Sequence, residues 1–187
     1  MLFGQYGPDL RKRALGIDNR PLSMEHDIKS FSNEVTFATD KVDQDEILHT
    51  IRSLSEQVGR RLRKKSLSGS TIHIKLRWAD FTTITRQVTI SSGTNLDQEI
   101  FDAAKDLFIE NWPKGKPVRL VGVGLSNLGP PVHQLHLWDD EHQKEANLLN
   151  AVDDLRQRFG RDIIKRAHHL KKEPKQHSDE NIEDDDR

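Results

Sequence analysis

Residues 71–78 alternate strictly between polar and apolar side chains, and this pattern constrains the fold more than any other feature of the chain. Ile72, Ile74, Leu76 and Trp78 are apolar, whereas the residues between them are polar or basic. Because successive side chains of a strand point to opposite faces of a sheet, this alternation predicts a strand with one buried and one exposed face. The chain must therefore supply neighbouring strands and a layer that covers one side of the sheet.

The segments around this strand switch repeatedly between strand and helix periodicity. Strands are predicted over 30–39, 72–78, 84–91 and 118–125, with turns at 68–70 and 79–82. A capping-box pattern, Asp43-x-x-Glu46, begins one helix, and Thr94-Asn95 is expected to cap a second that ends near Trp112. The order β-α-β-β-α-β predicts the α+β class: a split βαβ sandwich in which two helices cover one face of a four-stranded sheet, with flanking helices. The other face stays free for a ligand.

Composition limits the kind of protein this can be. The chain has 187 residues, 34% of them hydrophobic and 32% charged, which suits one folded core with appendages. It has no cysteine, no N-terminal signal-peptide pattern and no apolar run of roughly 18 residues, so we expect a cytoplasmic protein. The net charge of -1 conceals an asymmetry, because residues 1–132 carry 19 Lys/Arg and 16 Asp/Glu, whereas 133–187 carry 10 and 14.

Residues 134–138, Gln-Leu-His-Leu-Trp, form a short apolar segment between two prolines and the acidic residues 139–141. An exposed segment of this kind is costly unless a partner covers it, which indicates binding to a second protein. The alternative is that Leu135, Leu137 and Trp138 fold back onto the domain or onto the last helix, since tryptophan contributes as much to cores as to interfaces.

Several blocks of the sequence resemble, in the same order, the C-terminal part of bacterial Y-family lesion-bypass polymerases of the DinB, or DNA polymerase IV, type. They are Phe3-Gly4-x-x-Gly7 through Arg20-Pro21, Lys29-Ser30-x-Ser32-x-Glu34-x-Thr36-Phe37, Lys75 to Phe81, Thr85-Arg86, and Val118 to Leu128. The resemblance runs from residue 3 to about 170. It implies a thumb remnant and linker (1–22), a little finger-like DNA-binding domain (23–128), a linker with a clamp-binding peptide (129–142), a C-terminal helix (143–170) and an acidic tail expected to be disordered (171–187).

The resemblance implies that the domain grips duplex or primer-template DNA through phosphate oxygens, using hydroxyl groups and Lys or Arg side chains. The candidate DNA-binding residues are Lys29, Ser30, Ser32, Lys75, Arg77, Thr85, Arg86 and Arg119. Lys75 and Arg77 share one face by period two. Strict alternation instead places Arg86 and Arg119 on the apolar side of their strands, so either would need a bulge or a strand end to reach DNA.

Residues 134–138 are similar to the family's sliding-clamp-binding peptide, Gln-Leu-x-Leu-Phe, with Trp in the last place. Gln134, Leu135, Leu137 and Trp138 are therefore the candidate clamp-binding residues, with a bacterial sliding clamp as the partner. In the family, the carboxylates that hold two Mg²⁺ ions lie in the palm, on the N-terminal side of the thumb. We therefore expect no catalytic residues and no cofactor in this chain.

Other patterns are weaker. His133, His136 and His142 lie near acidic residues, and Asp184 to Asp186 form a carboxylate run, but neither group predicts a metal site. The basic run 60–65 is interpreted as a solvated helix end. The main alternative function is a stand-alone module that binds RNA or another protein with this sheet. A metal-dependent polymerase or nuclease ranks third.

Overall fold

The computed structural model describes residues 4–18, 28–131, 140–160 and 163–164. Its elements are the 3-10 helix η1 (Gly4–Tyr6), α1 (Gly7–Ala14), β1 (Ser30–Lys41), α2 (Gln44–Lys64), β2 (Ser68–Trp78), β3 (Thr83–Thr94), α3 (Asp97–Asn111), β4 (Val118–Gly129) and α4 (Asp140–Phe159). From β1 to β4 the order is β-α-β-β-α-β, as the sequence predicts.

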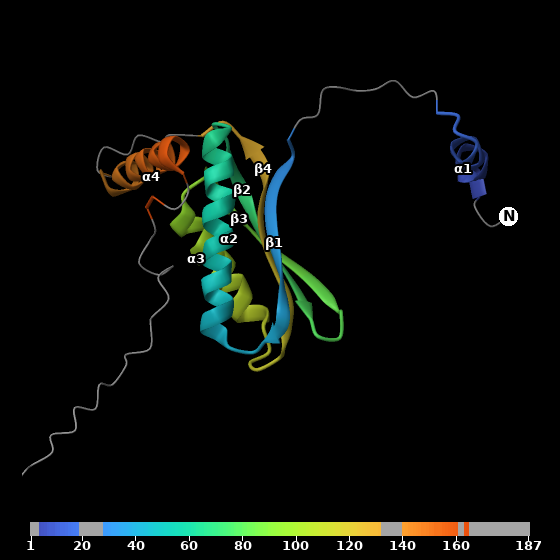
Figure 1. Cartoon of the computed structure of the whole chain (residues 1–187), viewed down its shortest axis with the longest axis horizontal. Coiled ribbons are helices and arrows are strands. Elements are labelled where there is room, and N and C mark those ends of the chain that lie inside the picture. The colour runs from blue at the N-terminus through green and yellow to red at the C-terminus, as the bar shows by residue number, and fades with distance from the viewer. Residues whose placement is uncertain (1–3, 19–27, 132–139, 161–162, 165–187) are drawn as a thin grey trace, which may run out of the picture.

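The four strands form one sheet in the order β1-β4-β2-β3, and every neighbouring pair is antiparallel. Helices α2 and α3 lie together on one side of this sheet (Figure 1). Because β4 lies between β1 and β2, and β2 lies between β3 and β4, each helix connects two parallel strands that are separated by one antiparallel strand. The predicted split βαβ sandwich is therefore confirmed.

The core lies between the sheet and the two helices. It is built from the apolar positions that alternate along the strands and recur at helical spacing. Among its fully buried side chains are Ile47, Ile51, Leu54, Val58 and Leu62 of α2, Ile72, Ile74 and Leu76 of β2, and Ile100 and Phe108 of α3. The central strand β4 adds Val121, Val123 and Leu125.

The helix beginnings follow their sequence signals only in part. The Asp43 carboxylate accepts a hydrogen bond from the Glu46 backbone N–H at 2.9 Å, which caps α2 as expected. For α3 the predicted cap was wrong. Thr94 belongs to β3, the capping position is Leu96, and the Thr94 hydroxyl accepts from the Leu96 N–H at 3.0 Å.

The strands are longer than the sequence pattern indicates. The sequence predicts a turn at 68–70, but these residues lie in β2, because Gly69 pairs with both Thr94 of β3 and Leu128 of β4. Small polar residues give no alternation of hydrophobicity, so pairing with two neighbours decides their conformation. In the same way, β4 continues to Gly129 instead of ending at 125.

Helix α4 begins at Asp140, three residues before the predicted start at 143, and ends at Phe159, where Gly160 has a φ of +94°. In the rest of the predicted range, residues 161–162 and 165–170 lie outside the described residues. Leu149 is buried, and the Arg63 guanidinium of α2 binds the Asp153 carboxylate of α4 at 2.8 Å. Figure 1 shows α4 beside the C-terminal end of α2. The expected disordered tail, 171–187, lies outside the described residues.

No helix in the described part of the chain has the length and apolar character needed to cross a membrane.

Candidate nucleic-acid interface

The side of the sheet away from α2 and α3 carries a regular array of polar side chains, which we call the open face. The strand registers place its residues in four rows. The first row holds Thr36, Leu120, Arg77 and Thr83; the second Glu34, Gly122, Lys75 and Thr85; the third Ser32, Gly124, His73 and Gln87; the fourth Ser30, Ser126, Thr71 and Thr89. Serine and threonine occupy half of these positions, and Glu34 is the single acidic residue among them.

Glycines occupy the middle of the open face. A Cβ atom on Gly122 would lie 3.0 Å from the Glu34 Cβ, and one on Gly124 would collide with the imidazole of His73. The side chains of β1 and β2 therefore close over β4 at these two positions. Gly122 and Gly124 are buried beneath these side chains, so the accessible surface of the open face is formed mainly by side chains of β1, β2 and β3.

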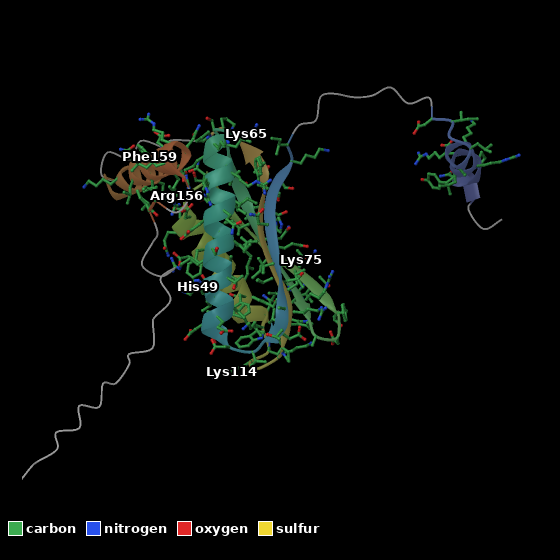
Figure 2. All side chains as sticks on the ribbon, viewed as in Figure 1. His49, Lys65, Lys75, Lys114, Arg156 and Phe159 are labelled. Carbon is green, nitrogen blue, oxygen red and sulfur yellow. The ribbon has the colours of Figure 1, made fainter. Side chains whose placement is uncertain are left out.

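The two cations predicted to share a face, Lys75 and Arg77, do lie together on the open face. Figure 2 shows Lys75 on the side of the sheet away from α2. Its ammonium lies 2.8 Å from a Glu34 carboxylate oxygen, and both side chains are partly exposed. The Arg77 Nε donates to the Thr83 hydroxyl at 2.9 Å, which holds the guanidinium along the sheet surface.

Three of the predicted hydroxyl residues, Ser30, Ser32 and Thr85, also lie on the open face and are exposed. Lys29 precedes β1 and is exposed. Six of the candidates therefore lie on the open face or at its edge. They are Lys29, Ser30, Ser32, Lys75, Arg77 and Thr85.

Arg119 reaches the end of the open face through an irregularity in β4. The register shifts between the pairs Arg77 with Leu120 and Trp78 with Val118, so Arg119 is an extra residue between two paired ones. This is the bulge that strict alternation required. Its guanidinium stacks over the Phe81 ring, 4.7 Å from the centroid, and lies 3.7 Å from an Asp40 carboxylate oxygen.

Arg86 lies on the opposite side from the other candidates. It pairs with Ile74, whose side chain is in the core, so Arg86 points toward the helix layer. Its Nε donates to the Asn111 side-chain oxygen at the end of α3, at 3.0 Å. No bulge moves it to the open face, since the β2–β3 register is continuous from Thr71 to Arg77.

His73 also lies on the open face, as the alternation predicts. The alternation that places Lys75 and Arg77 there also places His73, but the sequence pattern alone did not make it a candidate. Burial lowers the pKa of His73, which favours the neutral imidazole near pH 7.

The basic run 60–65 is more than the solvated helix end that we expected. Arg61 stacks on Phe31 of β1 and donates to the Ser32 carbonyl at 3.1 Å. Arg63 is buried and donates to the Asn95 carbonyl at 2.6 Å and to the Asp97 carboxylate at 2.8 Å. These contacts hold β1, α2 and the start of α3 together, and their partners are too far away in sequence for the run itself to reveal them.

The predicted clamp-binding residues, Gln134, Leu135, Leu137 and Trp138, lie outside the described residues. The chain on both sides of them is held by the domain. The Ser68 hydroxyl donates to the Pro130 carbonyl at 3.2 Å before the segment, and Asp153 anchors α4 after it. Within the described ranges, no group of three or more His, Cys, Asp or Glu side chains could hold a metal ion.

Residues 28–137 match the impB/mucB/samB family C-terminal domain. The chain is 37% identical over 159 residues to a DNA polymerase IV of Dehalococcoides mccartyi strain CBDB1, covering 84% of this chain and 40% of that protein. It is 33% identical over 178 residues to DNA polymerase IV 1 of Bacillus subtilis strain 168, covering 92% and 43% respectively. The chain thus spans about two fifths of the length of these curated relatives.

Among solved structures, the fold is similar to a complex of the beta-clamp processivity factor and the little finger domain of PolIV. The TM-score is 0.46 at 23% sequence identity, and the match covers 59% of this chain and 98% of that one.

Proposed function

Because the chain belongs to the impB/mucB/samB family, as the little finger region of a Y-family polymerase of the DNA polymerase IV type, we propose that it grips primer-template DNA and tethers it to a sliding clamp. Residues 23–128 hold the DNA, the segment 129–142 carries the clamp-binding peptide, and residues 1–22 connect the domain to a thumb. The C-terminal helix predicted over 143–170 is α4 (Asp140–Phe159) in the structure. DNA and a sliding clamp are its partners, and we place the protein in the cytoplasm.

The observation that supports DNA binding best is the composition of the open face. Its hydroxyl groups can donate to phosphate oxygens without reading base sequence. Lys75, Arg77 and, at the edge, Lys29 and Arg119 supply positive charge. A grip of this kind tolerates a distorted base pair, which suits a polymerase that copies damaged template.

The same face argues against the alternative of an RNA-recognition module. Such modules stack bases on aromatic side chains of the central strands. On the open face, β2 presents Thr71, His73, Lys75 and Arg77, while β4 presents Leu120, glycines and Ser126. Neither central strand places a Phe, Tyr or Trp there.

Clamp binding is proposed from residues 134–138 together with the anchoring of the chain around them. A peptide whose flanks are held by the domain loses less conformational entropy on binding than a free tail of the same sequence. Helix α4 lies on the helix layer, and the open face is on the other side of the sheet (Figure 1). The helix that follows the clamp-binding peptide therefore leaves the open face uncovered, and we infer that DNA and the clamp can bind at once.

We assign no catalytic step to this chain and no cofactor. Nucleotidyl transfer, with its Mg²⁺ ions, belongs in this proposal to the palm of the longer polymerase.

DNA binding is tested with the double substitution Lys75→Ala/Arg77→Ala. Fluorescence anisotropy with a labelled primer-template at low salt should show affinity falling by at least tenfold, because two phosphate contacts are lost. The slope of log K against log salt should become shallower by about 1.8, or about 0.9 per contact. Lys64→Ala/Lys65→Ala removes the same charge from the end of α2 and is the matched control. Equal affinity of both variants and the parent chain would contradict the proposal, as would a preference for single-stranded RNA over duplex DNA.

Clamp binding is tested separately with Leu137→Ala/Trp138→Ala and a purified bacterial sliding clamp. Surface plasmon resonance should show that clamp binding is abolished, whereas DNA affinity stays unchanged. If the variant binds the clamp as well as the parent chain does, residues 134–138 are not the clamp-binding peptide.

A further inference from the structure

The β2–β3 hairpin ends in an exposed aromatic side chain. Phe81 lies in the turn 79–82, its φ is +64°, and 63% of the residue is accessible to solvent. A left-handed backbone is unfavourable for a bulky L-residue, and exposing a phenyl ring adds a further cost. Where such an outlier is held in place by its surroundings, a functional role is a sound hypothesis.

Hydrogen bonds fix the conformation of this turn. The Trp78 N–H donates to the Thr82 carbonyl, and the Phe81 N–H donates to the Trp78 carbonyl, each at 3.0 Å. The Asp80 carboxylate accepts from the Thr82 N–H at 2.8 Å, and hydrogen bonds from Thr82 lower the pKa of Asp80. Phe81 is therefore presented to solvent by a defined turn.

One side of the Phe81 ring is in contact with a cation. The bulge in β4 brings the Arg119 guanidinium to 4.7 Å from the ring centroid, and an Asp40 carboxylate oxygen lies 3.7 Å from the same guanidinium. Arg119 keeps 39% of its side chain exposed. A ring with a guanidinium on one side and a largely exposed remainder offers a surface for another flat group.

The position of the pair indicates what that group is. Phe81 lies just beyond the row of the open face that contains Arg77 and Thr83. The chain enters β1, leaves β4 and docks α4 at the opposite end of the sheet (Figure 1). Segments of this chain that lead to other parts of the polymerase are therefore remote from Phe81, whereas DNA held on the open face is adjacent.

We propose that Phe81 and Arg119 form a stacking site for an unpaired base of the single strand that extends from the duplex on the open face. Bases within a duplex are stacked on each other and are not available to the ring, so the site selects single-stranded template. The phenyl ring supplies the stacking surface, and Arg119 supplies positive charge for the adjoining phosphate. This inference rests on the proposed function, and it concerns the single strand, which the DNA-gripping proposal leaves unassigned.

The test uses the full chain and two DNAs of the same duplex sequence, one blunt and one with a 5′ single-stranded overhang that contains 2-aminopurine. The parent chain should bind the overhang DNA about tenfold more tightly than the blunt DNA and should change the 2-aminopurine fluorescence. Phe81→Ala should abolish both effects and leave blunt-duplex affinity within twofold. Phe81→Trp should retain both, and Ile109→Ala, which truncates an exposed apolar residue on α3, is the control. Thermal melting checks that each variant is folded.

The other outcomes overturn the inference. If Phe81→Ala still prefers the overhang DNA, or loses affinity for the overhang and blunt DNAs equally, the ring does not stack on an unpaired base. If Phe81→Ala impairs only clamp binding, the ring belongs to a protein interface. If the parent chain binds neither DNA, the DNA-gripping proposal itself fails, and this inference fails with it.

Discussion

The Lys75 ammonium and the Glu34 carboxylate form a 2.8 Å ion pair in the second row of the open face. Glu34 is the single acidic residue of that face, and it neutralises one of the two cations at its centre. A phosphate that binds Lys75 must compete with this carboxylate. If the open face binds DNA as proposed, Glu34 is a built-in competitor that lowers the DNA affinity of the domain.

Replacing this competitor should tighten DNA binding. Glu34→Gln frees Lys75 and removes one repelling charge, so we expect affinity for a primer-template to rise severalfold at low salt, with the salt slope steeper by about 0.9. Anisotropy titrations at several salt concentrations measure both. Glu46→Gln is a closely matched control, because Glu46 pairs with Lys41 at 2.7 Å with similar exposure, but on α2. A gain of equal size in the control would show that only net charge matters.

His73 should make both stability and DNA binding depend on pH. Burial lowers the pKa of His73 below its unfolded value of about 6.5. As pH falls through 6.5, the unfolded chain takes up this proton before the folded domain does, so the contribution of His73 to stability is present above pH 6.5 and is lost below it. Urea denaturation at pH 7.5 and 5.5 should show a smaller pH dependence for His73→Gln than for the parent chain.

DNA affinity should change in the opposite direction, because a protonated His73 adds a cation to the open face next to Lys75. Anisotropy should show the parent chain binding more tightly at pH 5.5 than at pH 7.5, and His73→Gln should lose most of this difference. The same pH dependence in both proteins would place the responsible group elsewhere.

Gly124 lies where the side chains of β1 and β2 meet over β4, and this packing depends on its lack of a side chain. A Cβ atom there would collide with the His73 ring. We expect Gly124→Ala to destabilise the domain by about 1–3 kcal/mol through overpacking, as measured by urea denaturation. Gly129→Ala, at the end of the same strand with open space around its Cα, is the control and should be near neutral. A Cβ on Gly124 would also lie 2.6 Å from the Ser32 Cβ, so equal stability of the two variants would mean that both His73 and β1 give way freely.

Much of this architecture follows from local patterns in the sequence. The alternation in β2 is enough to place Lys75 and Arg77 on a free face, and the apolar positions of α2 are enough to orient that helix. These predictions are correct because each of these elements has one buried side, so the periodicity of apolar residues directly shows which side is buried.

The features that local patterns miss depend on residues distant in sequence. Arg119 reaches the open face only because the pairing of β4 with β2 accommodates an extra residue. Arg63 finds its partners 34 and 90 residues away. The left-handed turn at Phe81 is held by hydrogen bonds within the hairpin, and only the assembled bulge brings Arg119 onto its ring. The role of residues 134–138 stays a prediction.

Arg63 joins three helices through a buried ion network. Its guanidinium donates to Asp97 at the start of α3 and to Asp153 of α4, each at 2.8 Å, and its own side chain is 6% exposed. Burial alone would lower the pKa of Arg63, but the two carboxylates outweigh it and raise that pKa. Gly59 makes room for the network, since a Cβ there would meet the Asp97 carboxylate. Arg63 therefore fixes α4 to the domain.

Arg63→Met should destabilise the domain by about 3–5 kcal/mol, because it leaves the buried Asp97 without its countercharge. Urea denaturation measures this loss, and Lys64→Met, next in sequence but exposed, should lie within about 0.5 kcal/mol of the parent chain. The Asp153 side chain is 18% exposed, so Asp153→Asn should lower the free energy of unfolding by less than Arg63→Met does. Its main effect should be to release α4, so trypsin should cleave faster after Arg156 and Arg158. Unchanged cleavage in Asp153→Asn would mean that the burial of Leu149 holds α4 without the ion pair.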